Sequence, residues 1–126
     1  MKNNHQHVTQ YQCYLIIAKN NKNVSWMTLE EQIGALSEEY RDYIRPELEV
    51  LRTYISRLQT GAYSPEDMRS LQHLAHMQSG SAGSFGFDQL AEKAKATDLA
   101  MIQGTPIPEL VQHLKAWDAA LSATLA

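Results

Sequence analysis

Apolar residues recur at intervals of three and four through nearly all of the chain after Thr28, and this spacing is the feature that most limits the fold. It is typical of helices that have one apolar face. After residue 28 the sequence contains neither the alternating pattern of a half-buried strand nor an Asn-Gly hairpin turn. Because the helical segments are joined by short turns, they can pack against one another. We therefore expect an all-α fold, an antiparallel up-and-down four-helix bundle with an additional N-terminal helix.

Two segments carry clear signals for the start of a helix. Thr28 and Glu31 have the spacing of a capping box, in which each side chain bonds the backbone N–H of the other residue. Ser64 can cap a later helix with Pro65 in its first turn, where the missing N–H of proline has no helical partner to lose. The helix after Thr28 carries one apolar stripe, formed by Leu29, Ile33, Leu36, Tyr40 and Ile44.

Proline and glycine predict where helices end. Pro46 suits the first position of a helix and biases Arg45 away from helical geometry, so the apolar stretch around it is either two helices or one kinked helix. Residues 105–108 include two prolines and are expected to form a stiff extended connection to the last helix. Glycines that can end a helix are Gly61, Gly86 and Gly104.

Residues 1–26 differ in composition from the rest, with many asparagines around a short apolar run, Tyr14–Ala18. That run is far shorter than the roughly 18 residues needed to cross a bilayer. Lys19 follows it, rather than the small-residue cleavage site of a signal peptide. We therefore expect an appendage at residues 1–26, a bundle domain at residues 27–126 and a cytoplasmic protein. Met27 as an alternative start of translation is a hypothesis that the intact mass of the natural protein would test.

Length and charge exclude several functions. A chain of 126 residues suits one compact domain and is too short for a nucleotide-binding domain joined to a catalytic domain. Its 11 Lys plus Arg and 14 Asp plus Glu leave a net charge of −3, too small to attract nucleic acid or an anionic membrane. The single Cys13 cannot form an intramolecular disulfide, which favours a reducing compartment. Any ATP-dependent machinery is therefore expected on another polypeptide.

The candidate functional residue is His76, in the segment Leu74–Phe87. At about 100° per residue, this histidine lies opposite the apolar stripe of its helix and faces solvent. The residues on its side are all polar or lack a side chain: Arg69, Gln72, His73, Ser79, Gly80 and Gly83. Two glycines within a helix cost about 1 kcal/mol each relative to alanine, so we expect them to leave room for a second protein to approach the imidazole. Alternatively, they let neighbouring helices approach or mark an early helix end.

Histidine at such a place can act as a nucleophile, because an exposed imidazole is largely neutral at pH 7. No serine or cysteine accompanies it in a recognisable triad arrangement, so hydrolytic chemistry has no support. His73 and His76 are three residues apart and could hold a metal, with Met77 adjacent and His113 on a neighbouring helix of the bundle. The paired Glu-x-x-His motifs of di-metal bundles are absent from the sequence, however. Metal binding is thus the weaker interpretation.

The stretch after the histidine resembles the histidine-containing phosphotransfer (HPt) domain of bacterial phosphorelays. The family pattern is a histidine, two variable residues, often a lysine, then Gly-[Ser/Ala]-Ala-x-x-[Phe/Leu/Val]-Gly and a hydrophobic residue. Here it reads His76-Met-Gln-Ser79-Gly80-Ser81-Ala82-Gly83-Ser84-Phe85-Gly86-Phe87. The helical pattern fits the family's fold over residues 28–125. The resemblance implies that His76 accepts a phosphoryl group and that Gly80 is the small residue beside it.

The sequence departs from the family pattern at two places. Ser79 replaces the common lysine and can hydrogen-bond a phosphoryl oxygen, but it brings no positive charge. Thr97-Asp98 stands where a Leu-Glu pair is often found in the next helix. If the chain folds back after the His76 helix, Lys93 and Lys95 lie roughly level with the histidine. One of these lysines is therefore a candidate source of the missing charge.

The resemblance implies a two-way relay in which His76 accepts a phosphoryl group from a receiver-domain aspartate and passes it to a second receiver. The implied partners are receiver domains of response regulators and a hybrid sensor histidine kinase. The receiver brings its own Mg²⁺, so this chain needs no cofactor, has no ATP-dependent kinase activity of its own and is expected to be a monomer. The residues expected near the phosphoryl group or the partner are Arg69, Gln72, Ser79, Gly80, Gly83, Lys93 and Lys95. The alternative is a degenerate HPt-like module that docks a receiver or kinase without phosphotransfer.

Overall fold

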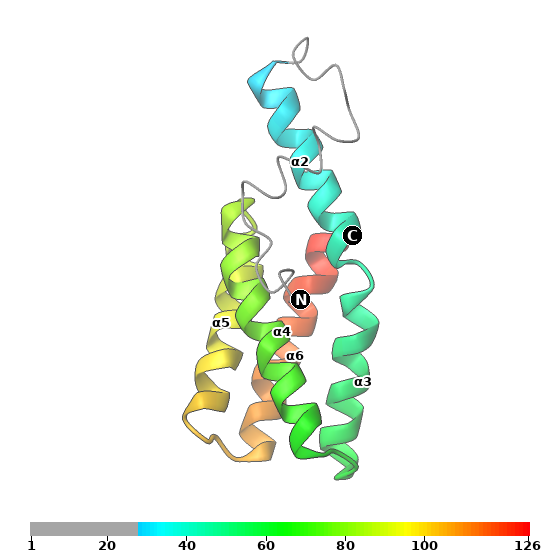
Figure 1. Cartoon of the computed structure of the whole chain (residues 1–126), viewed down its shortest axis with the longest axis vertical. Coiled ribbons are helices and arrows are strands. Elements are labelled where there is room, and N and C mark those ends of the chain that lie inside the picture. The colour runs from blue at the N-terminus through cyan, green and yellow to red at the C-terminus, as the bar shows by residue number, and fades with distance from the viewer. Residues whose placement is uncertain (1–27) are drawn as a thin grey trace.

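The computed structural model describes residues 28–126, and within them every regular element is an α-helix (Figure 1). The expected appendage, residues 1–26, and the hypothetical start at Met27 lie outside the described residues. The helices are α2 (Leu29–Ile44), α3 (Glu47–Thr60), α4 (Pro65–Ser84), α5 (Asp88–Ile102) and α6 (Ile107–Leu125).

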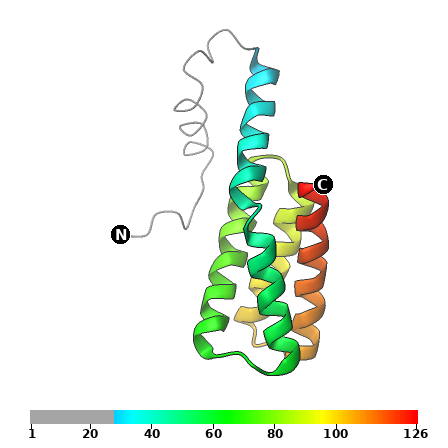
Figure 2. The same ribbon diagram turned by 90° about the vertical axis from the view of Figure 1, so that its right-hand side faces the viewer.

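Helices α3 to α6 form the bundle; α3 runs in the same direction as α2, and α4, α5 and α6 each run opposite to the helix before them (Figures 1 and 2). Around the ring, α4 packs between α3 and α5, and α6 packs between α5 and α3. Helix α2 precedes the bundle, and its first half stands beyond the end of the other helices in both views. This arrangement confirms the expected all-α, up-and-down bundle with an additional N-terminal helix.

The predicted capping box at Thr28 is present, and Ser64, predicted as a helix cap, forms a second capping box; these two pairs define where α2 and α4 begin. The Glu31 N–H donates to Thr28 Oγ1 at 3.1 Å, while the Thr28 N–H donates to Glu31 Oε1 at 2.8 Å. Ser64 and Asp67 make the same reciprocal pair at 3.1 and 3.0 Å, with Pro65 in the first turn. Each pair satisfies two backbone donors that a helix start would otherwise leave unbonded.

Two predictions about the proline segments are wrong in detail. Arg45 keeps helical backbone angles (φ −52°, ψ −45°), because its N–H still bonds the carbonyl of Arg41 one turn earlier. Helices α2 and α3 are nevertheless separate, with Pro46 just before the first residue of α3. The extended connection before α6 is shorter than expected. Ile107 and Pro108 already belong to α6, since a proline fits the first helical turn.

Glycine ends three of the helices as predicted. Gly61, Gly86 and Gly104 have φ values of 77°, 84° and 71°. This left-handed backbone conformation is strained for residues other than glycine. The turn at Gly86 is closed by the Phe87 N–H, which bonds the Ala82 carbonyl at 3.0 Å. This turn folds α5 back along α4 and so brings the second half of α5 level with His76.

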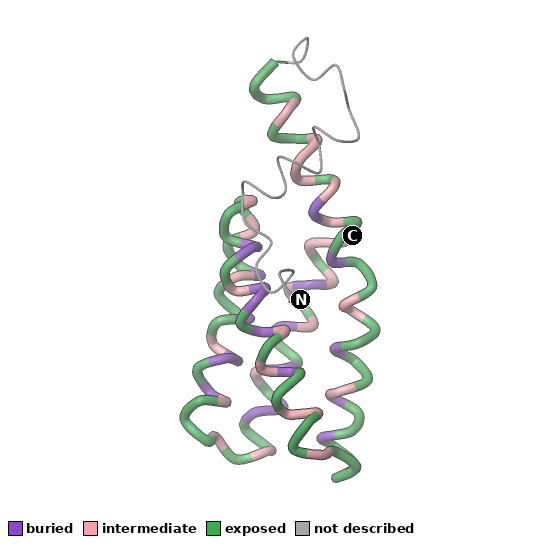
Figure 3. Tube along the Cα trace, in the orientation of Figure 1, coloured by how far each residue is buried: buried purple, intermediate pink, exposed green. Residues whose placement is uncertain are grey.

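The core is a continuous apolar cluster inside the ring (Figure 3). Its largest fully buried side chains are Trp117, Tyr40, Ile44, Leu51, Leu71, Leu90, Leu110, Leu114 and Leu121. The stripe predicted on α2 is only partly buried: Tyr40 and Ile44 are covered, whereas Leu29 and Ile33 are 71% and 53% exposed. The reason is that the first half of α2 extends past the bundle. Among residues 28–126, no helix combines the length and apolar character needed to span a membrane.

Candidate functional site

His76 lies on the solvent side of α4, as its helical spacing predicts. Its sequence neighbours Ala75 and Met77 are buried, while the His76 side chain is 61% exposed. The buried positions of α4 are Leu71, Ala75, Met77, Gln78, Ser81 and Ala82. Because these residues fix the rotation of α4 in the bundle, the core itself directs the imidazole outward.

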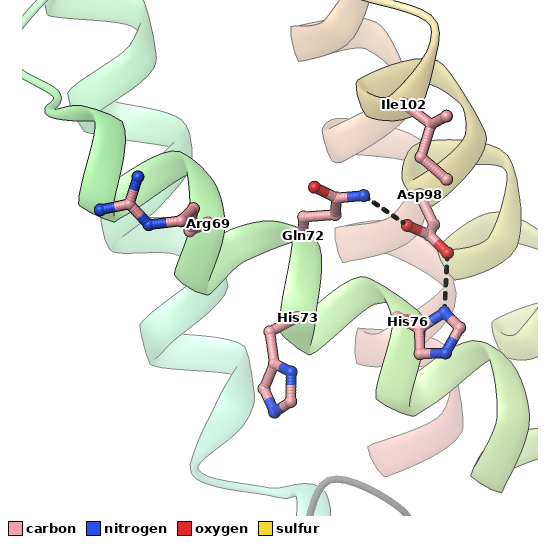
Figure 4. A pocket seen from close by; sticks show the side chains of 6 residues that line it. All are labelled: Arg69, Gln72, His73, His76, Asp98 and Ile102. Carbon is pink, nitrogen blue, oxygen red and sulfur yellow. Dashed lines mark hydrogen bonds and ion pairs between the residues drawn. The ribbon is translucent and has the colours of Figure 1, made fainter.

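A carboxylate from α5 holds the imidazole. His76 Nδ1 lies 3.0 Å from Asp98 Oδ2, and the Asp98 side chain is only 10% exposed (Figure 4). Gln72, one turn before His76 on α4, donates from Nε2 to Asp98 Oδ1 at 3.4 Å. The carboxylate is therefore bonded through both oxygens to α4. When Nδ1 carries the proton of this bond, the lone pair of the neutral ring lies on Nε2.

Sequence reasoning missed Asp98. In the sequence, Asp98 stood out only because Thr97-Asp98 replaces the common Leu-Glu pair. The structure shows that its acidic side chain lies at the contact between α4 and α5. Its signal in the sequence is weak, because one aspartate in a charged helix is ordinary. The antiparallel register of α4 and α5 explains the role of Asp98, because it brings Asp98 next to His76 and Gly83 opposite Ala91. That register depends on the turn at Gly86, which sequence spacing alone predicts only to within a residue or two.

The two glycines after His76 differ in their surroundings. Both are exposed, but a Cβ at Gly80 would have no atom within 4 Å, whereas a Cβ at Gly83 would lie 3.7 Å from Ala91 Cβ. The second distance is an ordinary van der Waals contact, so close helix packing does not require either glycine. Gly80 therefore leaves open surface one turn beyond the imidazole, which agrees with the clearance hypothesis and not with helix approach.

The other residues predicted to contact the phosphoryl group, Ser79, Lys93 and Lys95, differ in how they lie relative to His76. The Ser79 hydroxyl donates to the His76 carbonyl at 2.8 Å, so it would have to rotate before it could donate to a phosphoryl oxygen. Lys95 stands four residues after Ala91 and three before Asp98, which places it on the α5 face that meets α4. Lys93 lies about 140° from Asp98 around the axis of α5, and so on another face of that helix. By helical spacing, Lys95 is closer than Lys93 to the face of α5 that carries Asp98.

An open pocket of about 470 Å³ lies beside the imidazole, between α4 and α5. Its lining residues are Arg69, Gln72, His73, His76, Asp98 and Ile102 (Figure 4). Three predicted residues, Arg69, Gln72 and His73, therefore share one surface with His76. Ser79, Gly80, Gly83, Lys93 and Lys95 lie outside this lining.

The metal hypothesis gains no support. Within residues 28–126, no group of three or more His, Cys, Asp or Glu side chains is placed to hold a metal ion. The Thr97 hydroxyl contacts the backbone carbonyl of His113 on α6, not its imidazole. Among the described residues, His73 and His76 are therefore not joined by a third side chain placed to complete a metal site.

The fold and the site define an all-α bundle that presents His76 to solvent and anchors it through a buried carboxylate. A family model described as the Hpt domain matches residues 35–126, which is most of the chain, and the chain belongs to this family. Hpt domains are phosphotransfer modules of phosphorelays and interact with receiver domains. Comparisons with curated proteins and with solved structures found no match.

Proposed function

We propose that this chain is a phosphorelay intermediate that accepts a phosphoryl group on Nε2 of His76 from a receiver-domain aspartate and passes it to a second receiver. The observation that carries the proposal is the bond between His76 Nδ1 and Asp98 Oδ2 at 3.0 Å, on an imidazole whose side chain is 61% exposed. When Nδ1 donates to Asp98, Nε2 carries the lone pair of the neutral ring, and more than half of the side chain is exposed. We expect the protein to act in the cytoplasm as a monomer.

The transfer is balanced without a cofactor bound to this chain. The Nε2 lone pair forms the N–P bond as the P–O bond to the receiver aspartate breaks, and that bonding pair returns to the aspartate oxygen. The ring becomes a phosphoimidazolium, with its proton still on Nδ1. The receiver supplies Mg²⁺ and much of the positioning that accelerates phosphoryl transfer.

Asp98 supports this step by its charge and its position. A carboxylate on Nδ1 stabilises the positive charge that develops on the ring, as an acid does for the histidine of a catalytic triad. It also fixes the orientation of the ring, because Asp98 is itself held by the core and by Gln72. We therefore assign Asp98 as a positioning residue for His76.

Lys95 is the proposed source of positive charge near the phosphoryl group in place of the lysine that Ser79 replaces. It is exposed, and among the described residues it makes no ion pair that would hold it elsewhere. Lys95→Ala should slow transfer several-fold, whereas Lys93→Ala, the matched variant on another face, should leave the rate unchanged. Equal rates for both variants and the wild type would remove lysine from the mechanism.

The decisive experiment follows label from a phosphorylated receiver domain to this chain. We expect acid-labile, base-stable label on the wild type and on His73→Gln, and none on His76→Gln. The His73 variant is a matched control because it removes an exposed imidazole from the same pocket. If all three proteins bind the receiver and none takes label, the chain is a docking module without phosphotransfer.

A further inference from the structure

Arg69 differs from every other arginine among residues 28–126. Arg41, Arg45, Arg52 and Arg57 each form an ion pair with an acidic side chain of this chain. Arg69 forms none with the described residues, although it is exposed in the pocket that holds His76. Its guanidinium is therefore available to an acidic group outside the chain.

Arg69 is poorly placed to contact the phosphoryl group itself. It lies two helical turns before His76, about 10 Å along the axis of α4. In Figure 4 its side chain points away from the imidazole. The opposite wall of the pocket ends at Ile102, which is 63% exposed and stands one turn after Asp98. The far end of the pocket thus offers a cation and an apolar side chain, separated from the reacting nitrogen.

Arg69 and Lys95 are two exposed cations that no ion pair among the described residues neutralises. The chain carries a net charge of −3, yet α4 has no acidic residue after Asp67, and the Asp98 carboxylate is already bonded to α4. Arg69 and Lys95 lie toward opposite ends of the face around His76. A partner whose reactive centre is built from carboxylates and a phosphoryl group would meet a complementary surface here.

We propose that Arg69 and Ile102 form a second contact for the receiver domain, which takes an acidic side chain next to an apolar one at the rim of the receiver's phosphorylation site. This inference rests on the proposed function, because it assumes that a receiver docks over His76. The contact sets affinity and the choice among receivers, while the chemistry at Nε2 is unchanged. Arg69 is accordingly a specificity residue and not a phosphate ligand.

The experiment uses the full chain and receiver domains from the organism that encodes it, each activated with beryllofluoride. Calorimetry should show about tenfold weaker binding for Arg69→Glu than for the wild type, with a weaker dependence on salt. Arg69→Lys should bind nearly as well as the wild type. Lys115→Glu is the matched control, since Lys115 is exposed on α6, makes no ion pair among the described residues and does not line the pocket.

Phosphotransfer kinetics separate the two proposals. Arg69→Glu should raise the KM for the phosphorylated receiver about tenfold and leave kcat within twofold of the wild type. Normal KM for Arg69→Glu, with intact transfer to His76, would overturn the contact and leave the relay function standing. Weaker binding by Arg69→Glu without label on any variant would overturn the relay and leave the contact standing. Absence of binding to every receiver would overturn both.

Discussion

Gln72 and Gln78 lie on different sides of α4, and each donates from its side-chain amide to a carboxylate on a neighbouring helix. Gln72 is half-buried and reaches Asp98 on α5, which in turn holds the exposed His76. Gln78 is 1% exposed and reaches Glu47 on α3, while its carbonyl oxygen accepts from Trp117 Nε1 at 2.8 Å. One helix thus uses the same pair of groups for a site open to solvent and for a bond inside the bundle.

The two clusters differ in what the loss of one member leaves behind. In the cluster around His76, the imidazole and the Gln72 amide reach solvent, so water can replace a hydrogen bond that either of them loses, and we expect this cluster to affect chemistry more than stability. Inside the bundle, water cannot replace the hydrogen bond that a buried polar group loses, so the loss lowers the free energy of unfolding. Variants on the two sides of α4 should therefore separate function from stability.

The largest effect on stability is expected for Gln78→Ala. This change leaves the indole N–H of Trp117 and the carboxyl group of Glu47 without their amide partner. We expect the free energy of unfolding to fall by about 2–3 kcal/mol, while transfer per folded molecule stays normal. Gln72→Ala should cost under about 0.5 kcal/mol, because that amide is partly solvated. Urea denaturation of both variants measures the difference, and equal losses would contradict it.

The largest effect on chemistry short of losing His76 itself is expected for Asp98→Ala. Without the carboxylate the ring loses its orientation and the stabilisation of its developing charge, so transfer should slow about tenfold, equivalent to roughly 1.4 kcal/mol. Asp98→Asn should recover part of the rate, because its carbonyl oxygen still accepts from Nδ1. Nitrogen NMR of His76 should show a smaller fraction of the tautomer protonated at Nδ1 in Asp98→Ala. Unchanged tautomers and rate would remove the positioning role.

These two clusters also show how far the sequence predicts the molecule. Helix boundaries followed from local chemistry, such as the Thr28–Glu31 capping box and the cap at Ser64, because the partners of each cap bond are three residues apart. The exposure of His76 followed from helical spacing. Asp98 and Glu47 did not follow, since each meets α4 from a different helix and only the tertiary register brings them together. Likewise, the exposed half of the α2 stripe reflects where the bundle ends.

A smaller effect is expected at Gly80, on the open side of α4. A Cβ there has no atom within 4 Å, so Gly80→Ala should raise the free energy of unfolding by up to about 1 kcal/mol through helix propensity. A long side chain, as in Gly80→Gln, should instead hinder the approach of a receiver and slow transfer. Gly83→Ala is the matched control, because its Cβ meets Ala91 at an ordinary 3.7 Å. Normal transfer by Gly80→Gln would contradict the clearance hypothesis.

The smallest effect concerns Glu47, the half-buried carboxylate that accepts from Gln78. Burial raises the pKa of Glu47 above its ordinary 4.5, and the bond from Gln78 offsets this only in part. The folded protein therefore binds a proton here more readily than the unfolded chain does. This contribution to stability is full below about pH 4.5 and is lost as the pH rises through the raised pKa of Glu47.

Glu47→Gln tests this sign directly, because glutamine stays neutral and its carbonyl oxygen can still accept from Gln78. The variant should be more stable than the wild type at pH 7, and the difference should shrink as the pH falls toward 4.5. Urea denaturation at matched pH values measures the difference between the two proteins, so the titration of all other groups cancels. A variant that is less stable at pH 7, or a difference that does not vary with pH, would show that the Glu47 carboxylate is not penalised by burial. The hydrogen-bonded groups on the two sides of α4 would then differ less in their contribution to stability than their burial indicates.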